Sequence, residues 1–224
     1  MSVLRFCKFP VNPESMARES IMAASSPFRT PSQREADRVA KRDAVLRAAV
    51  RMFNERGFHA TSLDDVATSL GISKRTIYHY LANKDQVLLE CITIGLQQLL
   101  QAAEMARQEA GTGRDRLIKF LRRYAEINMG EFGRCVIRTG EEVLAQESMP
   151  RYRALKREID TALRGMLSAA VADGSIAPVD IKMAAFTLAG ALNWPARWHE
   201  QAGPMSASDI AASMVDILMK GLEP

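Results

Sequence analysis

The segment from Thr61 to Asp85, TSLDDVATSLGISKRTIYHYLANKD, constrains the fold of this chain more than any other feature. It predicts two short helices that are separated by a tight turn at Gly71 and followed at once by a third helix. Ser62 and Ser73 stand where the two short helices need capping side chains, and Asn83 stands before the third. Two helices joined by a short turn that contains glycine form the helix-turn-helix pattern, which lays its second helix in a DNA groove. The sequence therefore predicts a DNA-binding motif.

The second helix of this pattern, Lys74–Tyr80, is short and basic. Ile77 and Leu81 are four residues apart and are expected to anchor the helix to the core, which turns its other side chains outward. Arginine bonds guanine bidentately and threonine touches base edges, whereas tyrosine and lysine suit phosphate oxygens. The residues predicted to contact DNA are Thr61, Ser73, Lys74, Arg75, Thr76, Tyr78, His79, Tyr80 and Lys84. The alternative is ordinary helix packing, with the cations on a solvated face.

These residues resemble the N-terminal domain of the TetR family of transcriptional regulators, over about Arg42 to Glu90. The similarity begins with VLRAAVRMF, passes through Gly57 and Phe58, and continues with TSLDDVATSLGISKRTIYHYLANKDQVL. Leu81 replaces the usual phenylalanine, and Ala82 replaces a common lysine, which removes one phosphate contact. The resemblance implies an all-helical, two-domain homodimer. Its C-terminal domain would bind a small inducer and relieve repression.

Helical periodicity continues through the rest of the chain, and no segment predicts a strand. We expect an all-α fold of about nine helices, with a three-helix helix-turn-helix domain at 34–82. A helical ligand-binding and dimerisation domain would occupy 83–224. Outside the motif, the predicted helices span about 33–56, 83–110, a fifth around Leu117–Tyr124, 131–147, 148–173, 179–199 and 206–220. The last two, 179–222, are the candidate dimer face; the alternative is that they pack within one chain.

Residues 1–33 carry four prolines among serine, alanine and methionine, and they predict a disordered arm that ends in basic residues. Such an arm follows the DNA backbone or a minor groove, or is simply a solvated tail. Residues 29–85 hold 11 Lys/Arg and 7 Asp/Glu, whereas residues 86–224 hold 16 and 17. The positive excess therefore accompanies the motif, as expected of a protein that binds DNA.

Three widely spaced cysteines fit a reducing cytoplasm better than a disulfide framework or a zinc site. No apolar run approaches the roughly 20 residues that span a membrane, and no secretory signal is recognisable. The three histidines are scattered, and neither a phosphate-binding loop nor a nucleophile elbow is complete. We therefore expect no enzyme, metal site or cofactor, and a cytoplasmic location.

Trp194 and Trp198 are the only tryptophans and share one helix face, with Pro195 between them. Pro195 is expected to kink the helix, because proline removes a backbone donor. A kinked helix with two tryptophans forms one wall of a ligand pocket. Alternatively, the pair is an anchor of the core or of a dimer contact.

The run GALNWPARWHEQAG and the helix after it are similar to the C-terminal domains of TetR members that sense acyl-CoA thioesters. This similarity implies an apolar tunnel between the fifth, seventh and eighth helices, with arginines at the CoA phosphates. The arginine candidates are Arg138, Arg151, Arg153 and Arg197, unless each is solvated or pairs with Glu141, Glu142 or Glu147. The residues predicted to bind the ligand are Tyr124, Arg138, Trp194 and Trp198.

Together these features predict a sequence-specific transcriptional regulator that binds a palindromic operator as a homodimer and is a repressor relieved by a ligand. An acyl-CoA thioester is the candidate inducer; a cationic drug or an aromatic acid is an alternative. Two other readings stay open. One is an activator of the same fold, and the other is a small-molecule binding module whose helix-turn-helix is vestigial.

Overall fold

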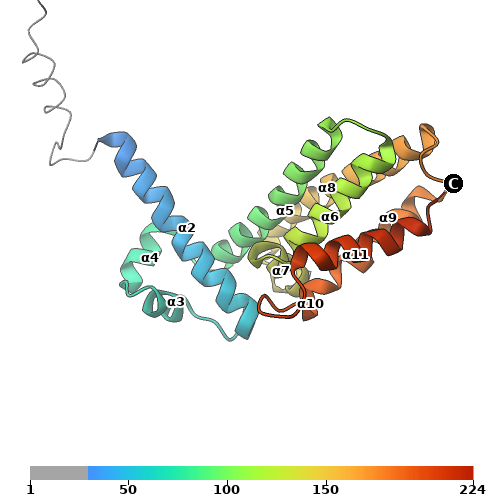
Figure 1. Cartoon of the computed structure of the whole chain (residues 1–224). Coiled ribbons are helices and arrows are strands. Elements are labelled where there is room, and N and C mark those ends of the chain that lie inside the picture. The colour runs from blue at the N-terminus through green and yellow to red at the C-terminus, as the bar shows by residue number, and fades with distance from the viewer. Residues whose placement is uncertain (1–29, 224) are drawn as a thin grey trace, which may run out of the picture. The chain divides into compact units, whose positions relative to one another are not determined.

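The computed structural model describes residues 30–223, and every regular element in that range is helical. Figure 1 shows the order of the elements along the chain. The α-helices are α2 (Pro31–Arg56), α3 (Leu63–Ser69), α4 (Lys74–Tyr80), α5 (Lys84–Gln108), α6 (Gly113–Met129), α7 (Glu131–Arg138), α8 (Met149–Ala172), α9 (Ile181–Asn193), α10 (Pro195–Trp198) and α11 (Ala207–Lys220). Two short 3₁₀ turns, η1 (Glu141–Val143) and η2 (Gln146–Ser148), lie between α7 and α8.

The described chain divides into two compact units, and the second begins at Arg42. The first contains residues 30–41, the initial turns of α2. Of the arm predicted for residues 1–33, residues 1–29 lie outside the described range. The predicted boundary is wrong at its end, because Pro31–Gln33 already belong to α2. Thr30 explains this early start: its hydroxyl accepts from the Gln33 backbone N–H at 3.2 Å, as a capping side chain does.

Within residues 30–223 the nine predicted helices are found, once α9 and α10 are counted as one interrupted helix. The interruption falls at Pro195, as predicted. The Trp194 N–H donates to the Ala191 carbonyl at 3.2 Å, and Pro195 has no N–H with which to continue the series. The helix predicted for 131–147 is too long, because α7 ends at Arg138. Thr139 and Gly140 are extended there, with ψ of 121° and 159°, and the chain continues as the two 3₁₀ turns.

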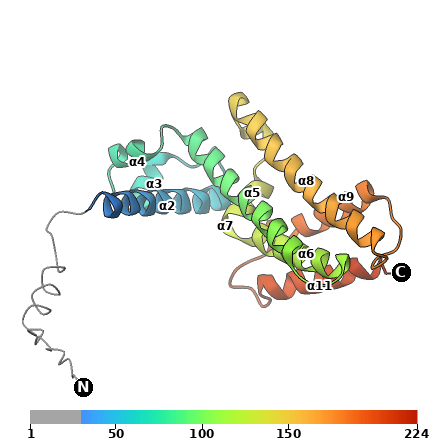
Figure 2. The same cartoon turned by 90° about the horizontal axis from the view of Figure 1, so that it is seen from above.

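The core of the second unit is built around α5, which packs against α6, α7 and α8. Figure 2 shows α5 and α6 running beside α8. Two glycines permit the close approach of α7. A Cβ at Gly95 of α5 would lie 2.8 Å from the carbonyl oxygen of Phe132, and one at Gly133 would lie 2.1 Å from that of Ile127. Short α7 is thereby held on both sides by backbone contacts that larger residues would prevent.

None of the helices in residues 30–223 combines the length and the apolar character that crossing a bilayer requires.

Candidate DNA interface and ligand pocket

The two short helices of the motif begin and end where the sequence predicts. Ser62 and Asp65 cap α3 reciprocally: the Asp65 N–H donates to Ser62 Oγ at 3.0 Å, and the Ser62 N–H donates to the Asp65 carboxylate at 2.9 Å. Gly71 closes α3 with a φ of +64°, a conformation that side chains disfavour. Ser73 then caps α4, its Oγ accepting from the Thr76 N–H at 3.2 Å. The turn is therefore specified by contacts within a few residues.

One face of α4 is buried and the other is exposed. Ile77 and Leu81 are fully buried, as predicted from their spacing. Lys74, Arg75, Tyr78 and His79 are exposed, and Thr76 and Tyr80 are half-buried. Tyr78 is 45 % exposed, and Lys74 Nζ lies 5.9 Å from the centre of its ring. The structure thus brings cations, a hydroxyl and aromatic groups together on one outward face.

The cations of this face differ in how strongly the protein already holds them. Lys74 Nζ donates to the Asp64 carboxylate at 2.8 Å, and this hydrogen bond raises the pKa of Lys74. Lys84 Nζ lies 4.1 Å from the centre of the Phe58 ring, a cation–π contact that fixes its side chain. Arg75 forms no ion pair with any residue of the described range. Among these three cations, Arg75 is therefore the one that no described residue holds through an ion pair or a ring contact.

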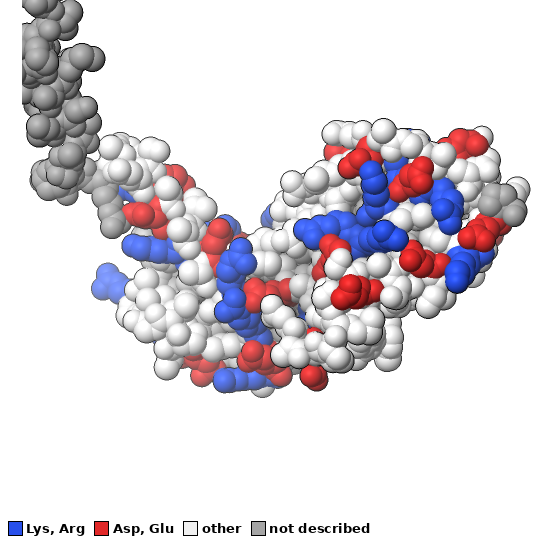
Figure 3. All heavy atoms as spheres, in the orientation of Figure 1, with Lys and Arg blue, Asp and Glu red and all other residues white. Residues whose placement is uncertain are grey.

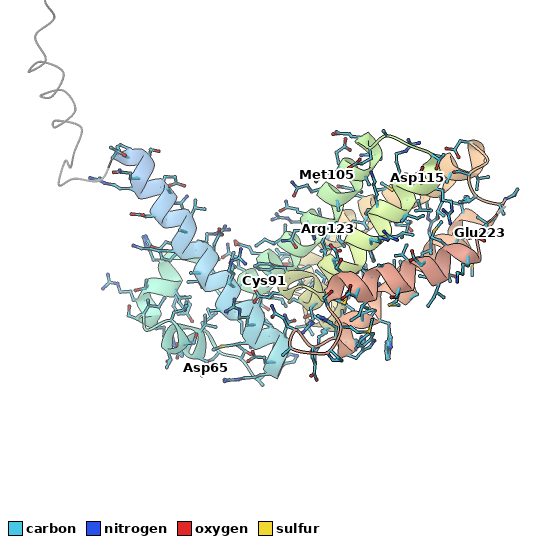
Figure 4. All side chains as sticks on the ribbon, in the orientation of Figure 1. Asp65, Cys91, Met105, Asp115, Arg123 and Glu223 are labelled. Atoms are coloured by element: carbon cyan, nitrogen blue, oxygen red, sulfur yellow. The ribbon has the colours of Figure 1, made fainter. Side chains whose placement is uncertain are left out.

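Thr61 does not belong to the accessible face, contrary to its prediction as a DNA contact. Its side chain is 2 % exposed, and its hydroxyl donates to the carbonyl of Gly57 at 2.9 Å. The residue closes the turn between α2 and α3, which leaves no side-chain atom for a phosphate. The acidic Asp64 and Asp65 beside it occupy the first turn of α3, where the helix dipole favours them. Figure 4 labels Asp65 there.

A pocket of about 650 Å³ lies in the C-terminal half of the chain. This is within the range typical of small-molecule sites. Its walls come from α5, α6, α7, α8, α9 and α10, with the loop after α7. The apolar lining residues are Leu96, Leu99, Val136, Ile137, Ile159, Leu163, Ala185, Phe186 and Ala189. Two further grooves, between α5 and α8 and between α5 and α6, have volumes of about 690 and 780 Å³, and charged side chains make up a larger share of their linings.

Two of the four predicted ligand residues line the pocket. Tyr124 reaches it from α6 and Trp194 from the end of α9. The other two predictions are not supported. Arg138 is exposed, and its neighbours Ile137 and Thr139 line the pocket instead. Trp198 is 48 % exposed and outside the lining, because the break at Pro195 starts a new short helix in which Arg197 faces the pocket.

Basic side chains gather at the pocket, but they are mostly not those predicted. Lys156, Arg157 and Arg197 line it together with Glu141 and Asp160. Lys156 lies 3.5 Å from the Glu141 carboxylate, and Asp160 pairs with Arg164 at 2.9 Å. Neither Arg157 nor Arg197 forms an ion pair with another described residue. These two are the guanidinium groups left to bind an anion.

The sequence analysis predicted Arg197 and missed Lys156 and Arg157. Lys156 follows Tyr152 on α8 by four residues and Arg157 precedes Asp160 by three, and these spacings are the signal that places each of them beside another lining residue. Two amides, Asn128 and Asn193, were also missed. Asn128 follows Tyr124 by four residues, and Tyr124 Oη donates to Asn193 Oδ1 at 2.9 Å. An amide side chain within an otherwise apolar helix face is the sequence signal that could have identified Asn128 and Asn193.

Short α7 connects the two sites. At its start, the backbone carbonyl of Glu131 accepts from Asn54 Nδ2 at 2.8 Å, and the Glu131 carboxylate pairs with Arg51. Both partners lie on α2, the first helix of the DNA-binding part. At its end, Val136 and Ile137 line the pocket. The α7 residue that contacts α2, Glu131, is therefore only five positions before Val136 of the pocket wall.

On α6, away from the pocket, the Lys and Arg side chains stand among carboxylates. Figure 3 shows Lys and Arg gathered over α6, interspersed with Asp and Glu. Those cations are paired: Lys119 with Glu109 at 2.7 Å and Arg122 with Asp216 at 2.8 Å, for example. Exposed pairs of this kind contribute at most about 1 kcal/mol to stability. They leave the groove beside α6 less suited to an anion than the pocket is.

Known families match both halves of the chain. Residues 45–91 match the family described as "Bacterial regulatory proteins, tetR family", and residues 110–222 match "Tetracyclin repressor-like, C-terminal domain". The chain is 26 % identical over 203 residues to the HTH-type transcriptional repressor KstR2 of Mycolicibacterium smegmatis, covering 86 % of this chain and 94 % of that protein.

Solved structures agree with this. The crystal structure of PfmR, a TetR family transcriptional regulator from Thermus thermophilus, has a TM-score of 0.73 and 31 % identity, covering 80 % of this chain and 99 % of that one. AibR in complex with isovaleryl coenzyme A and operator DNA has a TM-score of 0.65 and 24 % identity, covering 79 % and 96 %. The likeness to AibR is a likeness of fold only.

Proposed function

The chain belongs to the TetR family of bacterial regulatory proteins, and we propose that it reads a palindromic operator as a homodimer and releases it when an acyl-CoA thioester binds. Family membership makes it a DNA-binding transcriptional repressor that responds to a ligand. The symmetry of the operator, the dimer and the class of ligand are the proposed part. The observation that carries it is the pocket at the end of α7, whose other end holds α2.

Apolar surface on the last helices supports the homodimer. Met183 and Phe186 of α9, Trp194 and Trp198 around Pro195, and Ile217 of α11 are each about half or more exposed. Large exposed apolar side chains are common at protein–protein contacts, where tryptophan is enriched among the residues that contribute most to binding. A twofold homodimer would present two α4 helices, one for each half-site of a palindrome.

The pocket and its charges support an acyl-CoA ligand. The lining is apolar enough for an acyl chain. Arg157 and Arg197 form no ion pair within the described range, and the phosphates of CoA would lie against them. The AibR structure of the same fold holds isovaleryl coenzyme A together with operator DNA. A plain fatty acid would fill the apolar part alone, whereas a thioester of CoA also uses the cations.

Because DNA and CoA are both intracellular, these partners support a cytoplasmic location, where the buried free thiols Cys91 and Cys135 would stay reduced.

Relief of repression follows from the position of α7. A ligand that packs against Val136 and Ile137 favours one placement of α7, and Glu131 transmits that placement to Arg51 and Asn54. Release requires the ligand to bind the DNA-free arrangement more tightly than the DNA-bound one. Cys91 of α5, labelled in Figure 4, adds a second contact with α2, since its thiol donates to the Leu46 carbonyl at 3.6 Å.

Fluorescence anisotropy tests the proposal. Purified protein is titrated onto fragments of the DNA upstream of its own gene and onto scrambled DNA, at physiological salt. We expect one palindromic fragment to bind about 10³-fold more tightly than scrambled DNA. Octanoyl-CoA should then release that fragment, whereas CoA alone and octanoate should not. Release by octanoate alone would replace the proposed ligand class with free fatty acids, and equal weak binding to every fragment would favour a vestigial motif.

A further inference from the structure

Three neutral polar side chains meet at the inner wall of the pocket. Tyr124 and Asn128 project from α6, and Asn193 is the last residue of α9. Tyr124 Oη and Asn128 Nδ2 both donate to Asn193 Oδ1, each at 2.9 Å. Tyr124 and Asn193 line the pocket, and Asn128 is fully buried behind them. The cluster exists because Pro195 ends α9 at this point and leaves Asn193 beside α6.

The two donors determine which way the Asn193 amide points. Because both approach its oxygen, the oxygen faces α6 and the amide nitrogen faces the pocket. That nitrogen has no hydrogen-bond partner among residues 30–223. Turning the amide over would set its N–H groups against the Nδ2 donor of Asn128, so the Asn128 amide opposes the other orientation. The pocket therefore presents a fixed N–H donor within a largely apolar wall.

The cluster is also one partner short. Asn128 Oδ1 is buried and accepts no hydrogen bond from any residue of the described range. Buried polar groups normally find partners, and an incomplete buried network is costly. Asn128 therefore takes part in the cluster through its amide nitrogen alone.

The charge around the cluster selects the group that it can bind. Burial raises the pKa of the Tyr124 phenol, so the phenol remains neutral and continues to donate. The cations of the pocket, Lys156, Arg157 and Arg197, lie on α8 and α10, and none of them bonds to the cluster. A carboxylate at Asn193 would lose its hydration without gaining a cation, whereas a neutral carbonyl oxygen needs only one or two donors.

We propose that Asn193 binds the thioester carbonyl of the ligand, which makes it the residue that distinguishes acyl thioesters from other CoA derivatives. This inference rests on the proposed function, since it assumes an acyl-CoA in the pocket. The acyl chain would then lie against the apolar wall, and the pantetheine would run toward Arg157 and Arg197. Tyr124 and Asn128 are positioning residues that fix the amide of Asn193.

Two probes that differ only in the carbonyl test this assignment. Octanoyl-CoA is a thioester, and octyl-CoA is the thioether that lacks the carbonyl but keeps the pantetheine amides and all phosphates. Their affinities for the full-length protein are measured by calorimetry, and operator release by anisotropy. We expect wild type to prefer octanoyl-CoA by about tenfold, the value of one buried hydrogen bond to a fixed donor. Asn193→Asp keeps the shape but removes the donor, and the ratio should fall to about one.

Asn193→Ala provides a second variant, and Tyr124→Phe should lower the ratio by less, because it only loosens the amide. The ratio between probes cancels any general weakening of CoA binding or of folding. Equal affinities of wild type for both probes, or an unchanged ratio in both Asn193 variants, would overturn the role of Asn193 while leaving the proposed function intact. Failure of both probes to bind wild type would overturn the ligand class itself and this inference with it.

Discussion

The helix-turn-helix and the ligand pocket are assembled in different ways. The hydrogen bonds that cap α3 and α4 join residues close in sequence, such as Ser62 with Asp65 and Ser73 with Thr76. The pocket is closed by residues from Leu96 to Arg197, which lie on six helices and one loop. One region is therefore specified locally and is charged and exposed. The other depends on how helices pack and is largely apolar. The two differ in what a single substitution can disturb.

The largest effect is expected where packing leaves no room, at Gly133 of α7. A Cβ there would lie 2.1 Å from the Ile127 carbonyl oxygen, a backbone atom that cannot move aside cheaply. Gly133→Ala should destabilise the protein by about 3 kcal/mol, the upper part of the range for overpacking. Urea unfolding measures this. Ligand response should suffer more than DNA affinity of the folded fraction, because α7 would shift at the pocket.

Gly165 of α8 provides the matched control. A Cβ at this helical glycine would meet nothing within 4 Å. Gly165→Ala should therefore stabilise the protein by about 0.5–1 kcal/mol, because alanine favours helix. If both substitutions had the same sign, close packing of α7 would not explain the effect.

The second effect concerns sequence discrimination by α4. Arg75→Ala should cost about 1–3 kcal/mol on the operator and little on random DNA, because an arginine on guanine reads sequence. Lys84→Ala should weaken binding to both DNAs alike and reduce the salt dependence, as expected of a phosphate contact. Anisotropy on operator and scrambled fragments separates the two. Equal losses on both DNAs from Arg75→Ala would remove its base-reading role.

The contrast between the regions also explains what could be predicted from the sequence. Caps, turns and the buried pair Ile77 and Leu81 follow from spacing, so the bounds of α4 were predicted to the residue. Thr61 was misassigned, because its hydroxyl is taken by a carbonyl of the preceding turn. That contact depends on three-dimensional closure of the loop between α2 and α3, which spacing alone does not reveal.

The pocket could be predicted only in outline. Its place among α6, α8 and α9 and the residues Tyr124 and Trp194 were anticipated. Arg138 and Trp198 were not placed correctly, because helix ends decide which side chains face inward. At the end of α7 it is Thr139 and not the exposed Arg138 that lines the pocket, and after Pro195 it is Arg197 and not Trp198. Small shifts in helix boundaries thus matter more at a pocket than in a local motif.

A third, smaller effect concerns helix capping by serine, which occurs in both regions. Ser73 caps α4 and Ser206 caps α11, each through Oγ, at 3.2 and 3.1 Å from the N–H groups of Thr76 and Asp209. Alanine at either position should cost about 1 kcal/mol of stability, the usual value for a cap. Only Ser73→Ala should also weaken operator binding, measured by anisotropy after folding is confirmed by circular dichroism. A similar loss of DNA affinity in Ser206→Ala would mean that stability alone controls binding.

The smallest effect is a pH dependence that belongs to the C-terminal region. His199 follows α10 and is buried, and Arg134 Nη2 lies 3.1 Å from its Nδ1 and 2.9 Å from its carbonyl oxygen. Burial and then the charge of Arg134 lower the pKa of His199 below its ordinary 6.5. The neutral ring suits this site, because Nδ1 can accept from a guanidinium only when it carries no proton.

The sign of the effect follows from which state binds the proton first. Unfolded His199 takes up a proton near pH 6.5, while folded His199 does so only at lower pH. Stability should therefore be complete above that pH and fall by about 1 kcal/mol or less as the pH drops toward the folded pKa. His199→Asn keeps an acceptor for Arg134 and cannot take up a proton in this range, so its stability should vary less. Urea midpoints between about pH 7.5 and 5.5 measure the difference, above the range in which aspartates with lowered pKa, such as Asp173, begin to contribute. If the urea midpoint changed with pH equally in wild type and His199→Asn, the pH dependence would belong to a group other than His199.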